Sequence, residues 1–198
     1  MDSDKNIILI IGCGYMANVY FSHFSFLKEN CFMVYRNKNS VNYIKTVEKF
    51  GDKFLISQEE AIELKPKLVL SCVSPESHLQ VIEPFISTVD LIAVEKPPSL
   101  NLDLIAKYSS LNHIKVLMNR RYYYWVSDLC LKARNSLIRR IIINIPEQFC
   151  EELWYGIPKS IPLNSIHVFD LISFISNGLN PPGFSKIKNK LGSIITDS

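Results

Sequence analysis

Short apolar runs of strand length recur along the first part of the chain, at Ile7–Ile11, Phe32–Tyr35, Phe54–Ile56, Leu68–Cys72, Leu91–Val94 and Ile114–Met118. Most of these runs show little alternation of apolar and polar residues, which is the pattern of strands covered on both faces of a sheet. Helix-length segments lie between them, including Met16–Lys28, Ser40–Phe50, Glu76–Phe85 and Leu102–Ser109. This order of elements predicts an α/β fold with a doubly wound parallel sheet and right-handed crossovers.

The pattern changes after Asn119. A helix is expected at Tyr123–Arg134, a longer strand at Ile138–Ile145, and an apolar helical stretch that stops at Gly178. The last twenty positions are expected to be loosely structured or to form one final strand. We therefore expect two domains, residues 1–119 and residues 120–198, the second a truncated α+β domain.

Composition and charge narrow the function classes. The chain has 198 residues, 47% hydrophobic and 21% charged, which is typical of a folded globular protein. Its 22 basic and 19 acidic side chains give a net charge of only +3, so charge alone does not suggest nucleic acid. We expect no membrane span, because no window approaches eighteen apolar residues and the charged start does not resemble an export signal.

Cysteine and histidine spacing argues against a metal centre. The five cysteines include no C-x-x-C pair, and mostly lie in or beside apolar runs, which fits a reducing cytoplasm. The four histidines show no metal-ligand spacing either, so we predict no metal site.

The stretch "IILIIGCGYMANVY" has the form of a nucleotide-binding turn. A strand runs into Gly12 and Gly14 at the start of a helix, where the first glycine permits a tight turn and the second lets the backbone approach a pyrophosphate. Ala17 occupies the third position, which needs only a small side chain. This motif predicts a Rossmann-type sheet, although a tight turn without a ligand remains an alternative.

The end of the second strand bears on the choice of cofactor. A carboxylate there usually binds the adenosine ribose of NAD, but this strand ends in Arg36, Asn37 and Lys38. An arginine can form a planar fork to the 2′-phosphate of NADP. We therefore expect NADP, with NAD possible; a solvated basic loop is the alternative.

Four further motifs follow in order: "VSPESH" (Val73–His78), "VEKPPSLN" (Val94–Asn101), "MNRRYY" (Met118–Tyr123) and "NSIHVFDLI" (Asn164–Ile172). This succession resembles the glucose–fructose oxidoreductase/inositol dehydrogenase (Gfo/Idh/MocA) family of NAD(P)-dependent oxidoreductases. The resemblance implies hydride transfer between nicotinamide and a carbon of a sugar or nucleotide-sugar substrate. Neither nucleic acid nor a membrane is implied as a partner.

The resemblance also implies roles for individual residues. Lys96 and His167 would be the catalytic acid–base pair, and Arg121, Asn164 and Asp170 would contact the substrate. The residues expected to bind the cofactor are Gly12, Gly14, Tyr15, Met16, Ala17, Arg36, Asn37, Lys38, Ser74, Pro75, His78, Glu95 and Lys96.

Each of these assignments has a structural alternative. Lys96 can be a surface residue in a proline-stiffened turn, His78 a helix cap, and His167 a core histidine. The run "RRYYYW" also fits a stacking platform for single-stranded nucleic acid, but its place after the sixth strand favours a domain junction.

Two departures from the family pattern favour a second class of function. Leu163 stands where an aspartate is common one helical turn before the catalytic histidine, and the chain has one clear strand candidate of the large sheet that family members carry. A lone strand has unpaired edges, so we expect a homo-oligomer or a partner chain to complete the sheet near Arg139–Pro146. The alternative to an enzyme is a non-catalytic dinucleotide-binding protein.

Overall fold

The computed structural model describes residues 6–27, 29–135, 137–138, 142, 152–154, 157–158, 165–176, 187–189 and 192–194. The chain divides into two compact units, Met1–Leu117 and Met118–Ser198. The predicted functions of the two parts of the chain stay predictions.

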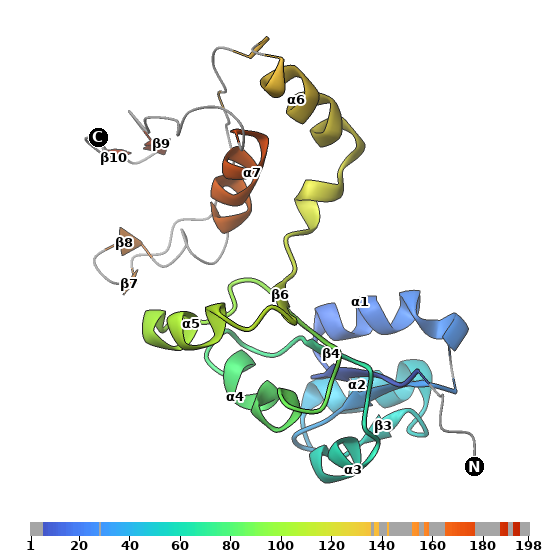
Figure 1. The fold of residues 1–198 in the computed structure, drawn as a ribbon. Helices are drawn as coiled ribbons and strands as arrows, with labels where there is room; N and C mark the ends of the chain where they lie inside the picture. Colours follow the sequence, from blue (N-terminus) through green and yellow to red (C-terminus); the bar gives the residue numbers. More distant parts are fainter. Residues whose placement is uncertain are drawn as a thin grey trace. The chain divides into compact units, whose positions relative to one another are not determined.

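The first unit is built on a parallel sheet of six strands in the order β3-β2-β1-β4-β5-β6 (Figure 1). The strands are β1 (Ile8–Ile11), β2 (Cys31–Val34), β3 (Leu55–Ile56), β4 (Leu68–Ser71), β5 (Leu91–Val94) and β6 (Ile114–Val116). The central strand β1 pairs with β2 on one side and β4 on the other, so the direction of winding reverses between β1 and β4. The expected α/β, Rossmann-type doubly wound sheet is confirmed.

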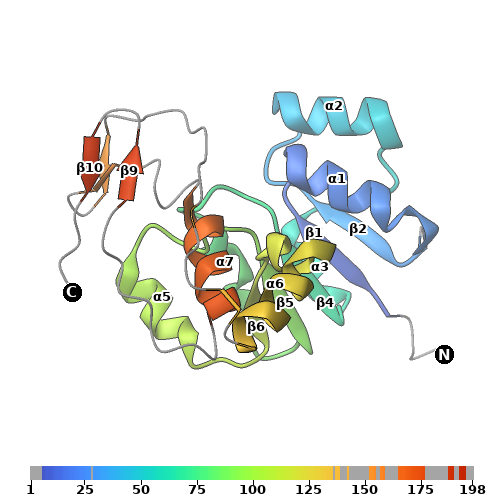
Figure 2. The ribbon, with the colours of Figure 1, turned by 90° about the horizontal axis from the view of Figure 1, so that it is seen from above.

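Helices cover both faces of this sheet, as Figures 1 and 2 show. They are α1 (Tyr15–His23), α2 (Val41–Phe50), α3 (Gln58–Glu63), α4 (His78–Ile82) and α5 (Leu102–Ser109), with short 3-10 helices η1 (Ser25–Leu27) and η2 (Glu83–Phe85). Alternate side chains of β1 enter different cores, because successive residues of a strand point to opposite faces. Both faces are therefore buried, which explains why the strands read as continuous apolar runs.

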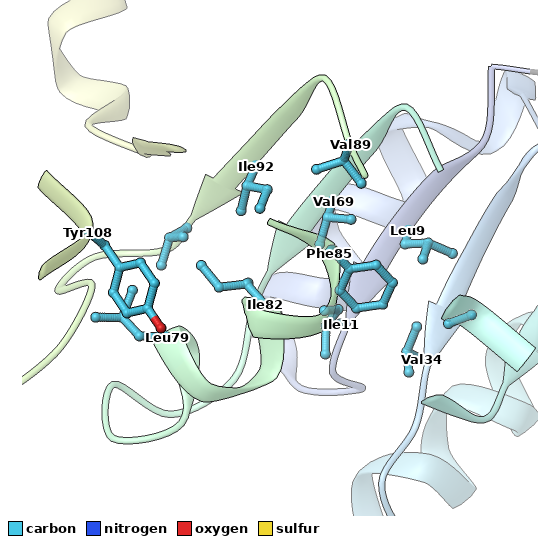
Figure 3. Close-up of a cluster of buried hydrophobic side chains, with 12 residues drawn as sticks. Leu9, Ile11, Val34, Val69, Leu79, Ile82, Phe85, Val89, Ile92 and Tyr108 are labelled. Carbon is cyan, nitrogen blue, oxygen red and sulfur yellow. The ribbon is translucent and has the colours of Figure 1, made fainter. Parts of the chain in front are cut away.

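Phe85 lies in the core on the face covered by α3, α4 and α5 (Figure 3). Its ring is 1% exposed and belongs to the same cluster as Leu9, Val69 and Ile82. On the opposite face, Phe21 of α1 packs edge-on against Phe50 of α2, with ring centroids 4.9 Å apart. This contact joins the first two helices of the unit, which carry the residues around the glycine turn.

Some helices of the first unit differ from the sequence-based expectation. Helix α1 ends at His23 and not at Lys28, and the segment expected as one helix over Glu76–Phe85 divides into α4 and η2. Ser22 Oγ donates to Asn18 O at 2.8 Å, and His23 Nδ1 lies 2.8 Å from Val19 O, after which the chain tightens into η1. Helix α3 was not expected; a capping box between Ser57 and Glu60 begins it.

The second unit contains η3 (Asn119–Tyr122), α6 (Tyr124–Arg134) and α7 (Ile166–Ser176). Val126 and Ala133 of α6 share a small core with Leu171 and Ile175 of α7. Four short strands form two antiparallel pairs, β7 (Leu153–Trp154) with β8 (Ile157–Pro158) and β9 (Ile187–Asn189) with β10 (Gly192–Ile194). The end of the chain thus holds two strands where one was expected.

Some expectations for the second unit fall outside the described residues. The strand expected at Ile138–Ile145 does so except for Ile138 and Ile142, as does most of the segment expected to meet a partner chain. In the described part of the chain, none of the helices has the length and apolar character that crossing a membrane requires.

Candidate functional site

Three of the sequence motifs meet at one edge of the sheet. Strands β1, β4 and β5 are parallel neighbours, so their carboxyl ends lie at the same edge. Gly12 follows β1, the loop that begins at Cys72 follows β4, and Glu95 follows β5. In open α/β sheets, ligands bind outside the carboxyl ends of the strands, where the winding reverses. This edge, between β1 and β4, is the candidate site.

Gly12 allows β1 and the loop after β4 to approach closely. Its backbone has φ +115°, a conformation that L side chains rarely adopt. A Cβ atom added there would lie 2.7 Å from the carbonyl oxygen of Cys72, which is backbone and cannot move aside cheaply. The amide of Gly12 donates to Val34 O at 2.9 Å. Only glycine satisfies both the torsion angle and the space at this position.

Gly14 has a different role from Gly12. It is the N-cap of α1 with φ −77° and ψ −174°, a conformation open to any residue, and an added Cβ would meet nothing within 4 Å. Among the described side chains none caps the helix, and its first turn holds no acidic residue. Among the described residues, no side chain therefore competes for the first N–H groups of α1, and the space beside Gly14 is open.

The residues after Gly14 follow the helix pattern. Tyr15 is 82% exposed, Met16 is partly buried, and Ala17 is fully buried against the sheet. Position 17 needs a small residue because α1 packs closely on β1. The sequence motif predicted a small side chain there for the same reason.

Two polar side chains that the sequence motifs did not identify hold the glycine turn. The amide Nδ2 of Asn18 lies 3.0 Å from Cys13 O and 2.8 Å from Gly14 O. It also lies 3.1 Å from Oγ1 of Thr46, a fully buried residue of α2. One feature of the sequence could have identified Asn18 and Thr46. Both are polar residues on helix faces that otherwise pack against apolar residues.

Tyr20 is a third residue that the motifs missed. Its hydroxyl donates to Glu95 Oε1 at 2.5 Å, and the other carboxylate oxygen accepts from the backbone N of Lys96 at 3.2 Å. Burial, followed by the hydrogen bond to Glu95, raises the pKa of Tyr20 above its usual range. The phenol is therefore a stable donor that fixes the carboxylate beside Lys96.

The loop after β2 presents its basic residues to solvent. Arg36, Asn37 and Lys38 are all exposed. Asn37 Oδ1 accepts from Asn39 N at 2.8 Å, and Lys38 Nζ lies 5.3 Å from the centre of the Tyr35 ring. The loop therefore exposes two cationic side chains, Arg36 and Lys38, and their role in cofactor binding stays a prediction.

The loop after β4 separates exposed residues from a buried histidine. Ser74 is exposed and bonds Ser77, and Pro75 is partly buried. His78 is 1% exposed, and its Nδ1 lies 2.8 Å from Ser71 Oγ. Burial lowers the pKa of His78 to about 4, so the ring is neutral at pH 7. In this position His78 supports the loop from beneath, and any effect on a ligand would pass through the loop backbone.

The predicted substrate residues of the second unit contact each other. Arg121 of η3 forms a two-point ion pair with Asp170 of α7, donating from Nε to Oδ2 at 2.8 Å and from a terminal nitrogen to Oδ1. The guanidinium also lies 5.0 Å from the Phe174 ring. The pair joins η3 to α7 and neutralises two charges that were expected to meet a substrate.

The structure describes only some of the other residues singled out in this unit. His167 is buried on α7, 6% exposed, and lies in a different unit from Lys96. Asn164 and Leu163 lie outside the described residues. Tyr122 and Tyr124 are 87% and 90% exposed. Within the described residues there is no group of three His, Cys, Asp or Glu side chains that could hold a metal ion.

Comparison with solved structures finds this fold in proteins of different function. The myo-inositol dehydrogenase of Lactobacillus casei, solved with NAD(H) and myo-inositol, matches with a TM-score of 0.63 at 15% identity, over 86% of this chain and 54% of that one. An NAD-binding protein from Listeria innocua gives 0.62 at 15% identity, over 87% and 55%. The transcriptional regulator Gal80p of Kluyveromyces lactis gives 0.56 at 13% identity, over 88% and 51%.

These matches confirm, for the fold, the resemblance to the glucose–fructose oxidoreductase/inositol dehydrogenase group that the motifs indicated. The chain spans about half the length of each of these structures. No protein-family model matches the sequence, and no curated protein matches it.

Substitution of the two glycines by alanine should affect stability to different extents. Gly12→Ala should lower the free energy of unfolding by about 1–3 kcal/mol, because the new methyl group meets the Cys72 carbonyl in a strained backbone conformation. Gly14→Ala should change it by less than about 1 kcal/mol, since its Cβ enters open space. Urea unfolding followed by circular dichroism measures both. Equal losses in the two variants would contradict this account of the turn.

Stability should also depend on pH through His78. Because the folded-state pKa of His78, about 4, lies below the value of 6.5 for an unperturbed histidine, the unfolded chain binds the proton first as the pH falls. The contribution is complete above about pH 6.5 and is lost toward pH 4, at about 1.4 kcal/mol per pH unit inside this window.

Urea unfolding at pH 7 and pH 5 tests this dependence. His78→Gln should flatten the loss of stability between the two pH values relative to the wild-type protein. The same pH dependence in both proteins would show that His78 does not carry it.

Proposed function

We propose that this protein is an NADP-linked oxidoreductase that transfers a hydride between nicotinamide and a carbon of a sugar or nucleotide sugar. The observation that carries the proposal is the meeting of the Gly12–Gly14 turn and the Glu95–Lys96 loop at the edge where the sheet reverses its winding. The first would bind the diphosphate and the second would lie at the nicotinamide end. A small-molecule substrate is also in keeping with the inositol dehydrogenase that shares the fold, which was solved with myo-inositol.

The residues around the turn fit a bound dinucleotide. An open space at Gly14, the uncapped N-terminus of α1 and the exposed Tyr15 leave room for a diphosphate beside backbone N–H groups. Arg36 and Lys38 would bind the 2′-phosphate that distinguishes NADP from NAD. Ser74 and Pro75 would line the cofactor from the loop after β4.

Lys96 is the residue that we assign to the chemistry. The bound nicotinamide would supply or accept the hydride. The hydroxyl oxygen of the substrate must lose or gain a proton in the same reaction, and a lysine beside it can polarise that oxygen and exchange the proton. The Tyr20–Glu95 hydrogen bond holds the neighbouring carboxylate, which would position the nicotinamide ribose. His167 would be the second acid–base group.

The alternative is a non-catalytic dinucleotide-binding protein. It is favoured by the ion pair between Arg121 and Asp170, which occupies both groups expected to meet the substrate, and by the burial of His167. The fold is shared with a protein described as a transcriptional regulator, so it does not by itself imply catalysis. Leu163 adds to this argument from the sequence.

Two broader proposals accompany the function. We propose a cytoplasmic location, in keeping with the free thiols of Cys13, Cys31, Cys72 and Cys130. We also propose self-association or a partner chain near residues 139–146, a segment that contains the exposed Ile142 and follows the exposed Leu137. A monodisperse monomer in light scattering at micromolar concentration would count against the second proposal.

The cofactor preference predicts the effect of one substitution. Wild-type protein should bind NADP more tightly than NAD, and Arg36→Ala should weaken NADP binding by about tenfold or more while leaving NAD nearly unchanged, because charge-assisted hydrogen bonds to the 2′-phosphate are lost. Arg134→Ala, which removes an exposed arginine from the second unit, is the matched control. Calorimetric titration decides the preference, and tighter binding of NAD would reverse it.

The catalytic role predicts a separation of binding from turnover. Lys96→Met should reduce kcat at least about 100-fold with a panel of inositols, sugars and nucleotide sugars, as expected for loss of a general acid–base group. Dinucleotide affinity should fall much less than kcat does. Lys67→Met, at an exposed ion pair with Asp90, is the control. Nucleotide fluorescence measures both quantities, and binding by wild-type protein without turnover on any substrate would support the non-catalytic alternative.

A further inference from the structure

The glycine turn is held by a side-chain cluster that we name the loop lock, formed by Asn18 of α1 and Thr46 of α2. The two hydrogens of Asn18 Nδ2 face three acceptors, namely Gly14 O at 2.8 Å, Cys13 O at 3.0 Å and Thr46 Oγ1 at 3.1 Å. Thr46 has no exposed surface, and its hydroxyl lies 2.8 Å from Asn42 O and 3.3 Å from Cys13 O. The loop lock thus joins both helices to the backbone of the turn.

The loop lock determines where the amides of the turn point. In a trans peptide unit the C=O and the N–H project in opposite directions, so fixing one fixes the other. Asn18 holds the carbonyl of Cys13, and the N–H of Gly14 therefore points away from the lock. The carbonyl of Gly14 is also held, because it accepts from both the backbone N–H and the side chain of Asn18. The N–H of Tyr15 belongs to the same peptide unit and therefore also points away from the loop lock.

We propose that Asn18, with Thr46 behind it, is a positioning residue for diphosphate binding, acting through the Cys13–Gly14 and Gly14–Tyr15 peptide units. This inference rests on the proposed binding of a dinucleotide at the turn. Glycines on both sides of Cys13 make the backbone permissive, so without a lock its peptide units sample several orientations. A ligand would then have to order the turn as it binds, which weakens its affinity.

The burial of Thr46 explains why two residues are needed. Asn18 is partly exposed on α1, and its amide has rotational freedom that an acceptor in the interior restricts. Thr46 is such an acceptor, and its hydroxyl is in turn oriented by the carbonyl of Asn42 in its own helix. Contact between α1 and α2, also made by Phe21 and Phe50, therefore supports the ligand site without touching the ligand.

Three variants and one matched control separate this role from general stability. Asn18→Leu removes the donor at similar size, Thr46→Val removes the hydroxyl at nearly equal shape, and Thr46→Ser restores it. Ser22→Ala is the control, because the Ser22 hydroxyl bonds Asn18 O on the same helix and does not reach the turn. Urea unfolding establishes that each protein is folded under the conditions used for binding.

Calorimetric titrations use NADP, NAD and ADP, and ligand-observed NMR uses adenosine, which lacks phosphate. We expect Asn18→Leu to weaken NADP and ADP by about tenfold and Thr46→Val by about threefold, with adenosine unchanged, since the lost hydrogen bonds order only the diphosphate site. Thr46→Ser and Ser22→Ala should bind as the wild type does. In the free protein, Asn18→Leu should also move the amide resonances of Gly14 and Tyr15.

The outcomes distinguish the two levels of the argument. If folded wild-type protein binds neither dinucleotide, the proposed function fails and the inference fails with it. If wild-type protein binds and Asn18→Leu binds equally well, or loses adenosine affinity to the same extent, the function stands and the loop lock has no role in positioning. Should Thr46→Val not fold, Asn18→Leu at its partly exposed position decides the question.

Discussion

The close approach of Gly12 to the carbonyl of Cys72 is the constraint on which the site depends. It holds the turn after β1 against the loop after β4, with a clearance that no side chain other than hydrogen permits. The chain then turns sharply enough for α1 to begin three residues later, at Tyr15, and to pack on the sheet through Ala17. The open N-terminus of α1, the exposed basic loop after β2 and the carboxylate of Glu95 are all arranged around this contact.

The polar contacts of the two units differ in what they imply for function. In the first unit, hydrogen bonds from Asn18, Thr46 and Tyr20 hold backbone and carboxylate groups in fixed orientations, as a binding site requires. In the described part of the second unit, Arg121 and Asp170, both expected to contact a substrate, form an ion pair with each other. The case for binding is thus stronger than the case for catalysis, which depends on Lys96 and on a histidine in the other unit.

Much of the fold was predictable from the sequence because its strands are buried on both faces. The continuous apolar runs predicted all six strands of the sheet to within about two residues, and the Gly12–Gly14 turn indicated a Rossmann-type sheet. Helix α3 was missed because it has only six residues and depends on a capping box. The early end of α1 was missed because the chain continues into the 3-10 helix η1, which the apolar pattern does not distinguish from a further turn of α-helix.

The site was predictable only where a motif fixes the backbone. Glycine and proline positions report local geometry, so the turn at Gly12 and the loop at Glu95 could be read in advance. The loop lock and the Tyr20–Glu95 bond join residues 28 and 75 positions apart, and local patterns carry no information on such pairs. For the same reason, the sequence did not reveal the ion pair between Arg121 and Asp170, which are 49 positions apart. The sequence analysis therefore assigned both residues to substrate contact.

Backbone amide NMR with added NADP tests the central claim most directly. The account predicts that the resonances of Gly12, Gly14 and Tyr15 shift furthest and saturate with the ligand, together with those of the loop after β2. Saturable shifts confined to another part of the protein, or no shifts at all in a folded sample with either NADP or NAD, would contradict it.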